Sequence, residues 1–135
     1  MLTIRQELID AMVAHARADH PDEACGVIAG PEGSDRPERF IPMVNAARSP
    51  TFYEFDSADL LRLYRDMDDR GEEPVVIYHS HTASVAYPSA EDVSYAGDPS
   101  VHYVIVSTLP EVEVAVRSFR IVQRKVTEEV IYIVH

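Results

Sequence analysis

The chain has 135 residues, a length typical of one domain with a substantial buried core and too short for two. Its formal net charge is −11, with 23 acidic against 12 basic side chains, which argues against a nucleic-acid partner because phosphate contacts need clustered Lys and Arg. No apolar run is long enough to cross a bilayer, residues 1–7 lack the hydrophobic stretch of a signal peptide, and the single Cys25 excludes an internal disulfide, so we expect one cytoplasmic domain spanning residues 1–135 with no membrane partner.

The first predicted element is a helix at residues 4–18. Apolar residues fall on one face of this segment, and Thr3 with Gln6 forms a capping-box pair at its start. Pro21 prevents the helix from continuing. The next segment, residues 25–30, is a short apolar run ended by Gly-Pro, and it is predicted to be a buried strand.

The middle of the chain is predicted to contain a loop, two short strands and a second helix. Residues 31–39 are rich in Gly, Ser, Asp and Pro, which indicates the loop, and residues 40–44 and 52–55 are predicted as the strands. Ser57 is expected to cap the helix, which carries apolar residues at helical spacing and ends at residues 70–71, Arg-Gly.

The second half of the chain is predicted to be rich in strands. Residues 74–78, Pro-Val-Val-Ile-Tyr, are continuously apolar and indicate a central strand covered on both faces. A short helix is expected at residues 89–96, and three strands follow at residues 101–107, 112–119 and 126–134. Helices interspersed with strands, followed by a meander, predict an α/β fold with a mixed sheet and helices packed against it.

The strongest candidate for chemistry is the run His79-Ser80-His81 after the predicted central strand. Residues i and i+2 of a strand face the same way about 6.6 Å apart. Two such imidazoles can share one zinc ion at Zn–N distances of about 2.0–2.1 Å. Val75 and Ile77 are expected on the same face. Asp92 would supply a third ligand and leave the fourth position for water, which is the arrangement of catalytic rather than structural zinc.

Each part of this pattern has a simpler interpretation. A His-x-His pair also occurs in surface turns, and Ser89 with Asp92 is also an ordinary helix N-terminus. Glu23, just before the first predicted strand, is a candidate base but equally a solvated residue. Cys25 is interpreted as a buried core residue. His102 is interpreted as a strand residue that could support the metal site from behind its ligands.

Two rival zinc chemistries lack a required residue. Nucleobase deaminases need a Cys-x-x-Cys pair, and this chain has one Cys. Metalloproteases of the His-Glu-x-x-His type need Glu after the first His, where Ser80 stands.

Taken together, Glu23, the His79-Ser80-His81 run, Ser89 and Asp92 resemble the signature of the JAMM (MPN+) metalloproteases. Residues 21–30 and 78–89 are similar to a branch of that family, the actinobacterial hydrolases that act on cysteinylated sulfur-carrier proteins. Thr82 stands where many members of the wider family have Pro, and it agrees with this branch.

The resemblance implies a fold, a cofactor and a role for each residue. The fold would be a curved mixed sheet in an α/β/α architecture like that of cytidine deaminases. One Zn²⁺ per chain would be held by His79, His81 and Asp92. Glu23 would be the general base that takes a proton from the attacking water and delivers it to the leaving amine. Ser89 would stabilise the oxyanion.

The function implied by the resemblance is hydrolysis of an amide. The enzyme would release cysteine from the C-terminal Gly-Gly end of a ubiquitin-like sulfur-carrier protein, a step in cysteine biosynthesis. Only a short segment separates Asp92 from the strand expected at residue 101, which suits a small leaving group. One alternative is an isopeptidase that removes ubiquitin-like modifiers from lysines. The other is a non-catalytic scaffold that binds a ubiquitin-like protein.

Overall fold

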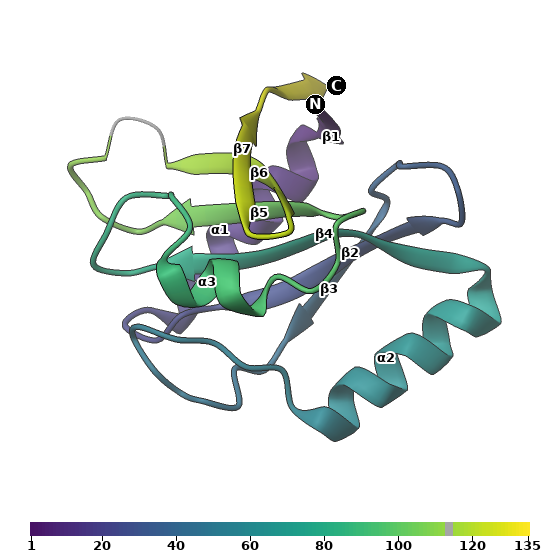
Figure 1. Ribbon diagram of the computed structural model, residues 1–135, viewed down its shortest axis with the longest axis horizontal. Helices are drawn as coiled ribbons and strands as arrows, with labels where there is room; N and C mark the ends of the chain where they lie inside the picture. Colours follow the sequence, from purple (N-terminus) through teal and green to yellow (C-terminus); the bar gives the residue numbers. More distant parts are fainter. Residues whose placement is uncertain (113–114) are drawn as a thin grey trace.

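A six-stranded mixed sheet forms the centre of the computed structural model, which describes residues 1–112 and 115–135 (Figure 1). The strand order is β3-β2-β4-β5-β6-β7. Its strands are β2 (Cys25–Pro31), β3 (Arg39–Met43), β4 (Glu72–His81), β5 (His102–Ser107), β6 (Val116–Val122) and β7 (Lys125–Glu129). Only β4 and β5 run parallel to each other, and the other neighbours are antiparallel. In the described residues, no helix has the length and apolar character needed to span a bilayer.

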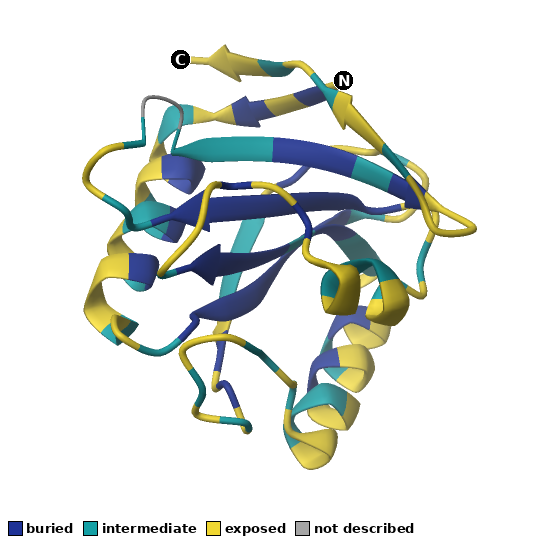
Figure 2. Ribbon diagram, turned by 60° about the vertical axis from the view of Figure 1, so that its left-hand side comes forward, coloured by how far each residue is buried: buried dark blue, intermediate teal, exposed yellow. Residues whose placement is uncertain are grey.

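Helices cover both faces of the sheet and make three layers. Helix α1 (Gln6–Asp19) packs on one face, where its buried residues meet those of β2, β4 and β5. Helices α2 (Ser57–Arg70) and α3 (Ala90–Tyr95) pack on the other face. Strands β2 and β5 and the second half of β4 are mostly buried between these layers (Figure 2). The predicted α/β fold with a mixed sheet in an α/β/α architecture is confirmed.

The N-terminal helix begins later than predicted. Residues 2–5 form strand β1 (Leu2–Arg5), which pairs in parallel with β8 (Ile131–Val134) in a separate two-stranded sheet. Helix α1 starts at Gln6, and its N-cap makes no side-chain hydrogen bond, so the predicted capping box is wrong. Leu2 and Ile4 are buried through pairing with a segment far away in the sequence, and this burial outweighs the local helical pattern.

The second helix is capped one residue earlier than predicted. The side chain of Asp56, not Ser57, accepts a hydrogen bond from the amide of Asp59 at 3.0 Å. The helix ends at Gly71 as predicted, because this residue adopts a left-handed conformation with φ of 68°.

Two of the predicted strands differ from the structure and a third does so in part. Residues 52–55 form a loop in which only Phe55 bridges to Asn45. The segment predicted at residues 126–134 is divided at Val130 into β7 and β8, which belong to different sheets. The strand predicted from residue 112 begins at Val116, and residues 113–114 of that prediction lie outside the described residues.

A bulge in β4 changes which face Val75 occupies. Ile28 of β2 pairs with Val76, but the next residue, Ala29, pairs with Pro74, so Val75 is the extra residue. Val75 therefore packs with Val76 and the other residues under α1, while Ile77 packs on the opposite face. The prediction that Val75 shares the face of Ile77 and the histidines is wrong, because strict alternation holds only after the bulge.

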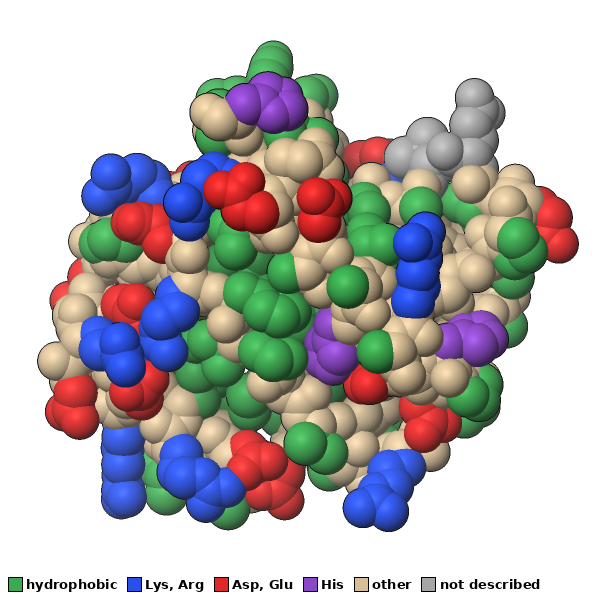
Figure 3. All heavy atoms as spheres, turned by 180° about the vertical axis from the view of Figure 1, so that it is seen from behind, with side chains coloured by type: hydrophobic (Ala, Val, Ile, Leu, Met, Phe, Trp, Pro, Cys, Tyr) green, Lys and Arg blue, Asp and Glu red, His purple; other side chains and the backbone are tan. Residues whose placement is uncertain are grey.

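The charged side chains on the surface are interspersed. On the face seen in Figure 3, Lys and Arg side chains lie among Asp and Glu side chains, with no continuous basic area in that view. One such mixed cluster lies across β3, α2 and β4, where Arg39 contacts Asp66 and Glu72 at 2.8 and 2.7 Å.

Candidate metal centre

Strand β4 ends in the two histidines of the predicted site. His79 and His81 are 2% and 4% exposed, and they lie on the face of the sheet that α3 covers. Their Nε2 atoms are 3.2 Å apart. Helix α3 places the Asp92 Oδ2 atom 3.1 Å from the His79 Nε2 atom and 2.9 Å from the His81 Nε2 atom. The three predicted ligands are thus brought together around one point.

This donor set fits a single metal ion. Two ligands at about 2.05 Å from an ion in a tetrahedron lie roughly 3.3 Å from each other. The three observed separations, 2.9 to 3.2 Å, are close to that value. Two neutral imidazoles and one carboxylate are ligands that zinc accepts, and three protein ligands leave one position open.

A capping box orients the Asp92 carboxylate. Ser89 is the N-cap of α3, and its hydroxyl oxygen accepts a hydrogen bond from the Asp92 amide at 3.1 Å. In return, the Asp92 Oδ2 atom accepts one from the Ser89 amide at 2.9 Å. Ser89 and Asp92 therefore form both an ordinary helix N-terminus and part of the candidate metal site, because the helix cap itself turns the carboxylate toward the histidines.

The pKa shifts of His79 and Asp92 suit metal binding, whereas that of His81 opposes it. Burial lowers the pKa of His79 and so favours its neutral form. Burial acts to raise the pKa of Asp92, but hydrogen bonds to His79 and His81 outweigh it and hold that pKa far below the usual range. For His81, burial acts to lower the pKa, and the hydrogen bonds to Asp92 and to the Val85 carbonyl raise it overall. An ionised carboxylate and a neutral imidazole are the forms that bind metals.

Glu23 lies beside the histidines, as expected from its place before β2. The Ala24 amide donates to the Ser80 Oγ atom at 2.7 Å, and the Ser80 amide donates to the Ala24 carbonyl at 3.0 Å. These bonds fix the backbone next to Glu23 against the centre of the His-Ser-His run. Glu23 is 4% exposed, and its buried Oε1 atom has no hydrogen-bond partner among the described residues.

Burial controls the acidity of Glu23. It raises the pKa of this carboxyl to about 8, with smaller increases from the charges of Asp92 and Glu91 and an opposing decrease from His81. A carboxyl with a pKa near neutrality can both accept and return a proton. A cation held by the adjacent donor cluster would favour its ionised form.

The loop at residues 45–55 forms a second wall of the site, which the sequence interpretation did not identify. The ring of Tyr53 stacks on the His79 ring, with centroids 4.5 Å apart and planes 22° apart. Asn45, which is buried, holds this loop through its side-chain amide. The Thr82 hydroxyl donates to the Pro50 carbonyl at 2.8 Å, a bond that a Pro at position 82 could not make. The one signal of this loop in the sequence was Asn45, followed seven residues later by the aromatic run that begins at Phe52.

A cavity of about 760 Å³ lies next to this loop. Tyr53 lines it together with other aromatic side chains from the loop, α2, α3 and β5. The Phe52 and Tyr95 rings, which both line it, contact each other edge to face with centroids 5.4 Å apart. The site is therefore bordered by an apolar hollow on the side of His79.

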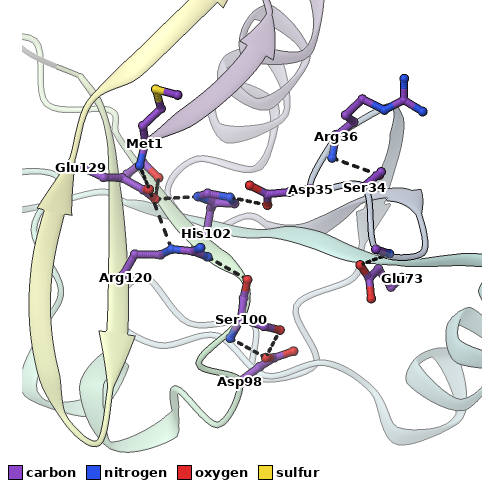
Figure 4. A network of polar contacts seen from close by, with 12 residues as sticks. Met1, Ser34, Asp35, Arg36, Glu73, Asp98, Ser100, His102, Arg120 and Glu129 are labelled. Atoms are coloured by element: carbon purple, nitrogen blue, oxygen red, sulfur yellow. Dashed lines mark hydrogen bonds and ion pairs between the residues drawn. The ribbon is translucent and has the colours of Figure 1, made fainter.

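Two other residues considered in the sequence, Cys25 and His102, are not among the ligands of the candidate metal site. Cys25 is fully buried in the core between the sheet and α2, and burial raises its thiol pKa to about 12, so the core interpretation is confirmed. His102 does not support the metal site. Its ring nitrogens each lie 2.7 Å from a carboxylate oxygen, of Asp35 and Glu129, at the opposite end of β5 from the residues beside His79 and His81 (Figure 4).

Known proteins share this sequence and fold. The family of prokaryotic homologs of the JAB domain matches residues 5–122. The CysO-cysteine peptidase of Mycobacterium tuberculosis is 62% identical over 134 residues, 99% of this chain and 92% of that protein. A desampylase of Haloferax volcanii is 32% identical over 111 residues, 78% of this chain and 80% of that protein. A solved structure from Desulfitobacterium hafniense superposes with a TM-score of 0.83 at 38% identity, covering 98% of this chain and 92% of the other. The chain therefore belongs to the prokaryotic JAB-domain family, the JAMM family that its motif resembles.

Proposed function

We propose that this protein is a zinc-dependent hydrolase that releases cysteine from the C-terminal Gly-Gly end of a ubiquitin-like sulfur-carrier protein. The observation that carries the proposal is the convergence of His79, His81 and Asp92 beside the buried Glu23 carboxyl. The substrate follows from the 62% identity to a CysO-cysteine peptidase over nearly the full chain. We place the reaction in the cytoplasm, as a step of cysteine biosynthesis.

The metal in this proposal is one Zn²⁺ per chain, held by His79, His81 and Asp92. The separations of the three donor atoms and the protonation states of His79 and Asp92 support this assignment. A zinc ion in such a site lowers the pKa of a water molecule to about 7 and polarises a carbonyl group.

Glu23 is the proton carrier of the reaction. Its carboxylate accepts a proton from the attacking water, and the same carboxyl then donates that proton to the nitrogen of the departing cysteine. The raised pKa of Glu23, about 8, favours the first transfer, and a bound cation, which favours the ionised carboxylate, would favour the second. The hydrogen bonds between Ala24 and Ser80 hold Glu23 close to the reacting atoms throughout.

Ser89 stabilises the developing oxyanion. Its hydroxyl oxygen accepts the helix-capping bond from Asp92, which leaves the hydroxyl hydrogen available to a substrate oxygen. The residue is exposed at the start of α3, so a substrate carbonyl can approach it. A donor aimed at the oxyanion contributes on the order of 3 kcal/mol to lowering the barrier.

An isopeptidase acting on lysine-linked modifiers is the second candidate. The 32% identity to a desampylase supports it, because that relative is named for a different activity. Only residues 96–101 connect α3 to β5, and this short connection favours a small leaving group over a second folded protein.

The test uses a purified carrier protein with cysteine attached to its C-terminal glycine. Incubation with the zinc-loaded enzyme should lower the mass of the carrier by one cysteine residue. The E23Q variant and the chelated enzyme should lose this activity. A carrier joined to a lysine side chain is the comparison substrate, and faster cleavage of that adduct would favour the isopeptidase. A wild-type protein that binds no zinc and cleaves neither adduct would support the non-catalytic scaffold.

A further inference from the structure

The two histidines differ in what fixes their rings. The His81 Nδ1 atom lies 2.9 Å from the Val85 carbonyl oxygen and 3.1 Å from the Ser84 hydroxyl. The His79 Nδ1 atom is buried and has no hydrogen-bond partner among the described residues. A histidine that binds a metal through one nitrogen usually has its other nitrogen fixed by a hydrogen bond. His79 lacks that support.

An aromatic contact occupies the equivalent place. The Tyr53 ring lies nearly parallel to the His79 ring at 4.5 Å between centroids. The second side-chain torsion of histidine has a broad distribution of angles. A ring packed against the face of the imidazole therefore restricts the rotation that a hydrogen bond would otherwise restrict. The His79 ring is almost completely buried, at 2% exposure.

We propose that Tyr53 is a positioning residue of the metal centre, whose ring holds His79 in its ligating orientation. The inference rests on the proposed zinc site. Tyr53 acts through His79, and its contribution is to metal affinity and to the geometry of the site.

Asn45 is the anchor that holds Tyr53 in place. Its Nδ2 atom donates to the carbonyls of Glu23 and Phe52 at 3.0 and 2.9 Å. Its Oδ1 atom accepts from the amides of Ala47 and Glu54 at 3.0 and 3.1 Å. One buried amide therefore binds the residues on both sides of Tyr53 and also the backbone of the proposed base.

This arrangement couples the two halves of the site. The same Nδ2 group fixes the backbone of Glu23 and of Phe52, so Asn45 sets the position of the base relative to the stacked pair Tyr53 and His79. The Asn45 side chain acts together with two backbone hydrogen bonds of the loop, from the Ala46 amide to the Glu54 carbonyl at 2.8 Å and from the Glu23 amide to the Ser49 carbonyl at 2.9 Å. A carboxylate at position 45 would keep the acceptor and lose both donors.

The first experiment measures Zn²⁺ affinity of the purified apoprotein by competition with a chromophoric chelator. Tyr53→Leu should weaken Zn²⁺ binding by roughly 10–100-fold, the usual effect of removing a group that orients a ligand. Tyr53→Phe keeps the ring, so its Zn²⁺ affinity should stay within about twofold of that of wild type. Tyr64→Leu, which changes another tyrosine of the same cavity away from His79, is the matched control and should bind Zn²⁺ normally.

Two further variants are needed. One tests the anchor Asn45, and the other replaces Tyr53→Leu if that protein does not fold. Asn45→Asp should weaken Zn²⁺ binding in the same direction as Tyr53→Leu, and it should change the absorption spectrum of the Co²⁺-substituted protein. If Tyr53→Leu does not fold, Tyr53→Met, which fills similar volume without a flat ring, replaces it and should show the same loss. Wild-type Zn²⁺ affinity in a folded Tyr53→Leu or Tyr53→Met protein would overturn the inference, and so would equal weakening by Tyr53→Phe.

The outcome is separable from that of the proposed function. Zn²⁺ binding by wild type that is lost in His81→Ala supports the site whatever the role of Tyr53. Failure to cleave the cysteinylated carrier would refute the substrate and leave the affinity comparison intact.

Discussion

The hydroxyl of Ser80 accepts a hydrogen bond of 2.7 Å from the backbone amide of Ala24, so the residue between the two histidines secures the residue next to Glu23. Ser80 points to the opposite side of β4 from its neighbours and is almost completely buried. One short run therefore supplies two candidate ligands on one face and, on the other, a hydrogen bond to the residue next to the candidate base.

Removing this contact should affect both stability and turnover. We expect Ser80→Ala to lower the free energy of unfolding by about 1–3 kcal/mol, because it leaves the Ala24 amide buried without a partner. The kcat for cysteine release should fall while Zn²⁺ affinity stays unchanged, since the ligands remain. Denaturant unfolding, chelator competition and the carrier mass assay measure these quantities. A variant with normal kcat would show that Ser80 does not position Glu23.

Substitutions at Ser89 should separate its capping role from its proposed catalytic role. Ala at this N-cap should cost about 1 kcal/mol of stability, whereas Gly should cost only a few tenths. Both variants lack the hydroxyl, so both should lose roughly 10²-fold or more in kcat if the hydroxyl stabilises the oxyanion. Thermal unfolding and steady-state kinetics distinguish the two effects. If kcat follows the loss of stability, being near normal in Ser89→Gly, the oxyanion role is wrong.

Metal removal should lower the thermal stability of the protein. A ligand present at 100 times its dissociation constant stabilises the folded state by about 2.7 kcal/mol. For a chain of this length that corresponds to a decrease in Tm of roughly 10 °C when a chelator removes the metal. The Tm of Asp92→Asn or His81→Ala should be insensitive to the chelator. A chelator-sensitive Tm in both variants would place the stabilising metal elsewhere.

Glu129 should make stability depend on pH. Burial acts to raise the pKa of its carboxyl, but hydrogen bonds from His102, the amino terminus and Ser118 lower it to about 2 (Figure 4). Because the pKa in the folded state is below the ordinary value of about 4.3, this contribution is present above that value and is lost as the pH falls toward 2.

The variant Glu129→Gln should therefore lose on the order of 2 kcal/mol of stability at pH 7 relative to wild type. The difference between the two proteins should shrink below about pH 4 and disappear near pH 2. Glu128→Gln is the control and should change stability little. It changes an exposed carboxylate on the same strand as Glu129, where it pairs with Arg117 of β6. If the difference in stability between Glu129→Gln and wild type is constant with pH, the substitution destabilises the protein through packing and not through the charge of Glu129.

The sequence was sufficient to predict the cluster of candidate ligands because its determinants are local. The spacing of His79 and His81 follows from the two-residue period of a strand, and the Ser89–Asp92 pair follows from helix capping. Both features are recognisable within a few residues. The predicted convergence of these ligands required only that α3 fold back on the end of β4.

What could not be predicted depends on contacts between distant segments. The strand β1 forms only because β8 lies beside it, 129 residues later at the pair Leu2 and Ile131. Residues 52–55 have the composition of a strand, but the side chain of Asn45 bonds the amide and carbonyl groups that a neighbouring strand would otherwise pair. The stacking of Tyr53 on His79 follows from that loop conformation.

The extra residue at Val75 separates β4 into two parts with independent alternation. On the side of the histidines, Cys25 pairs with His79 and Ile28 with Val76 in regular register. On the side of α2, the pairing is offset by one residue. A single-residue insertion or deletion within a strand would ordinarily turn every side chain beyond it to the opposite face of the sheet. A bulge at this position can absorb such a change in the first residues of β4, so both imidazoles keep their orientation.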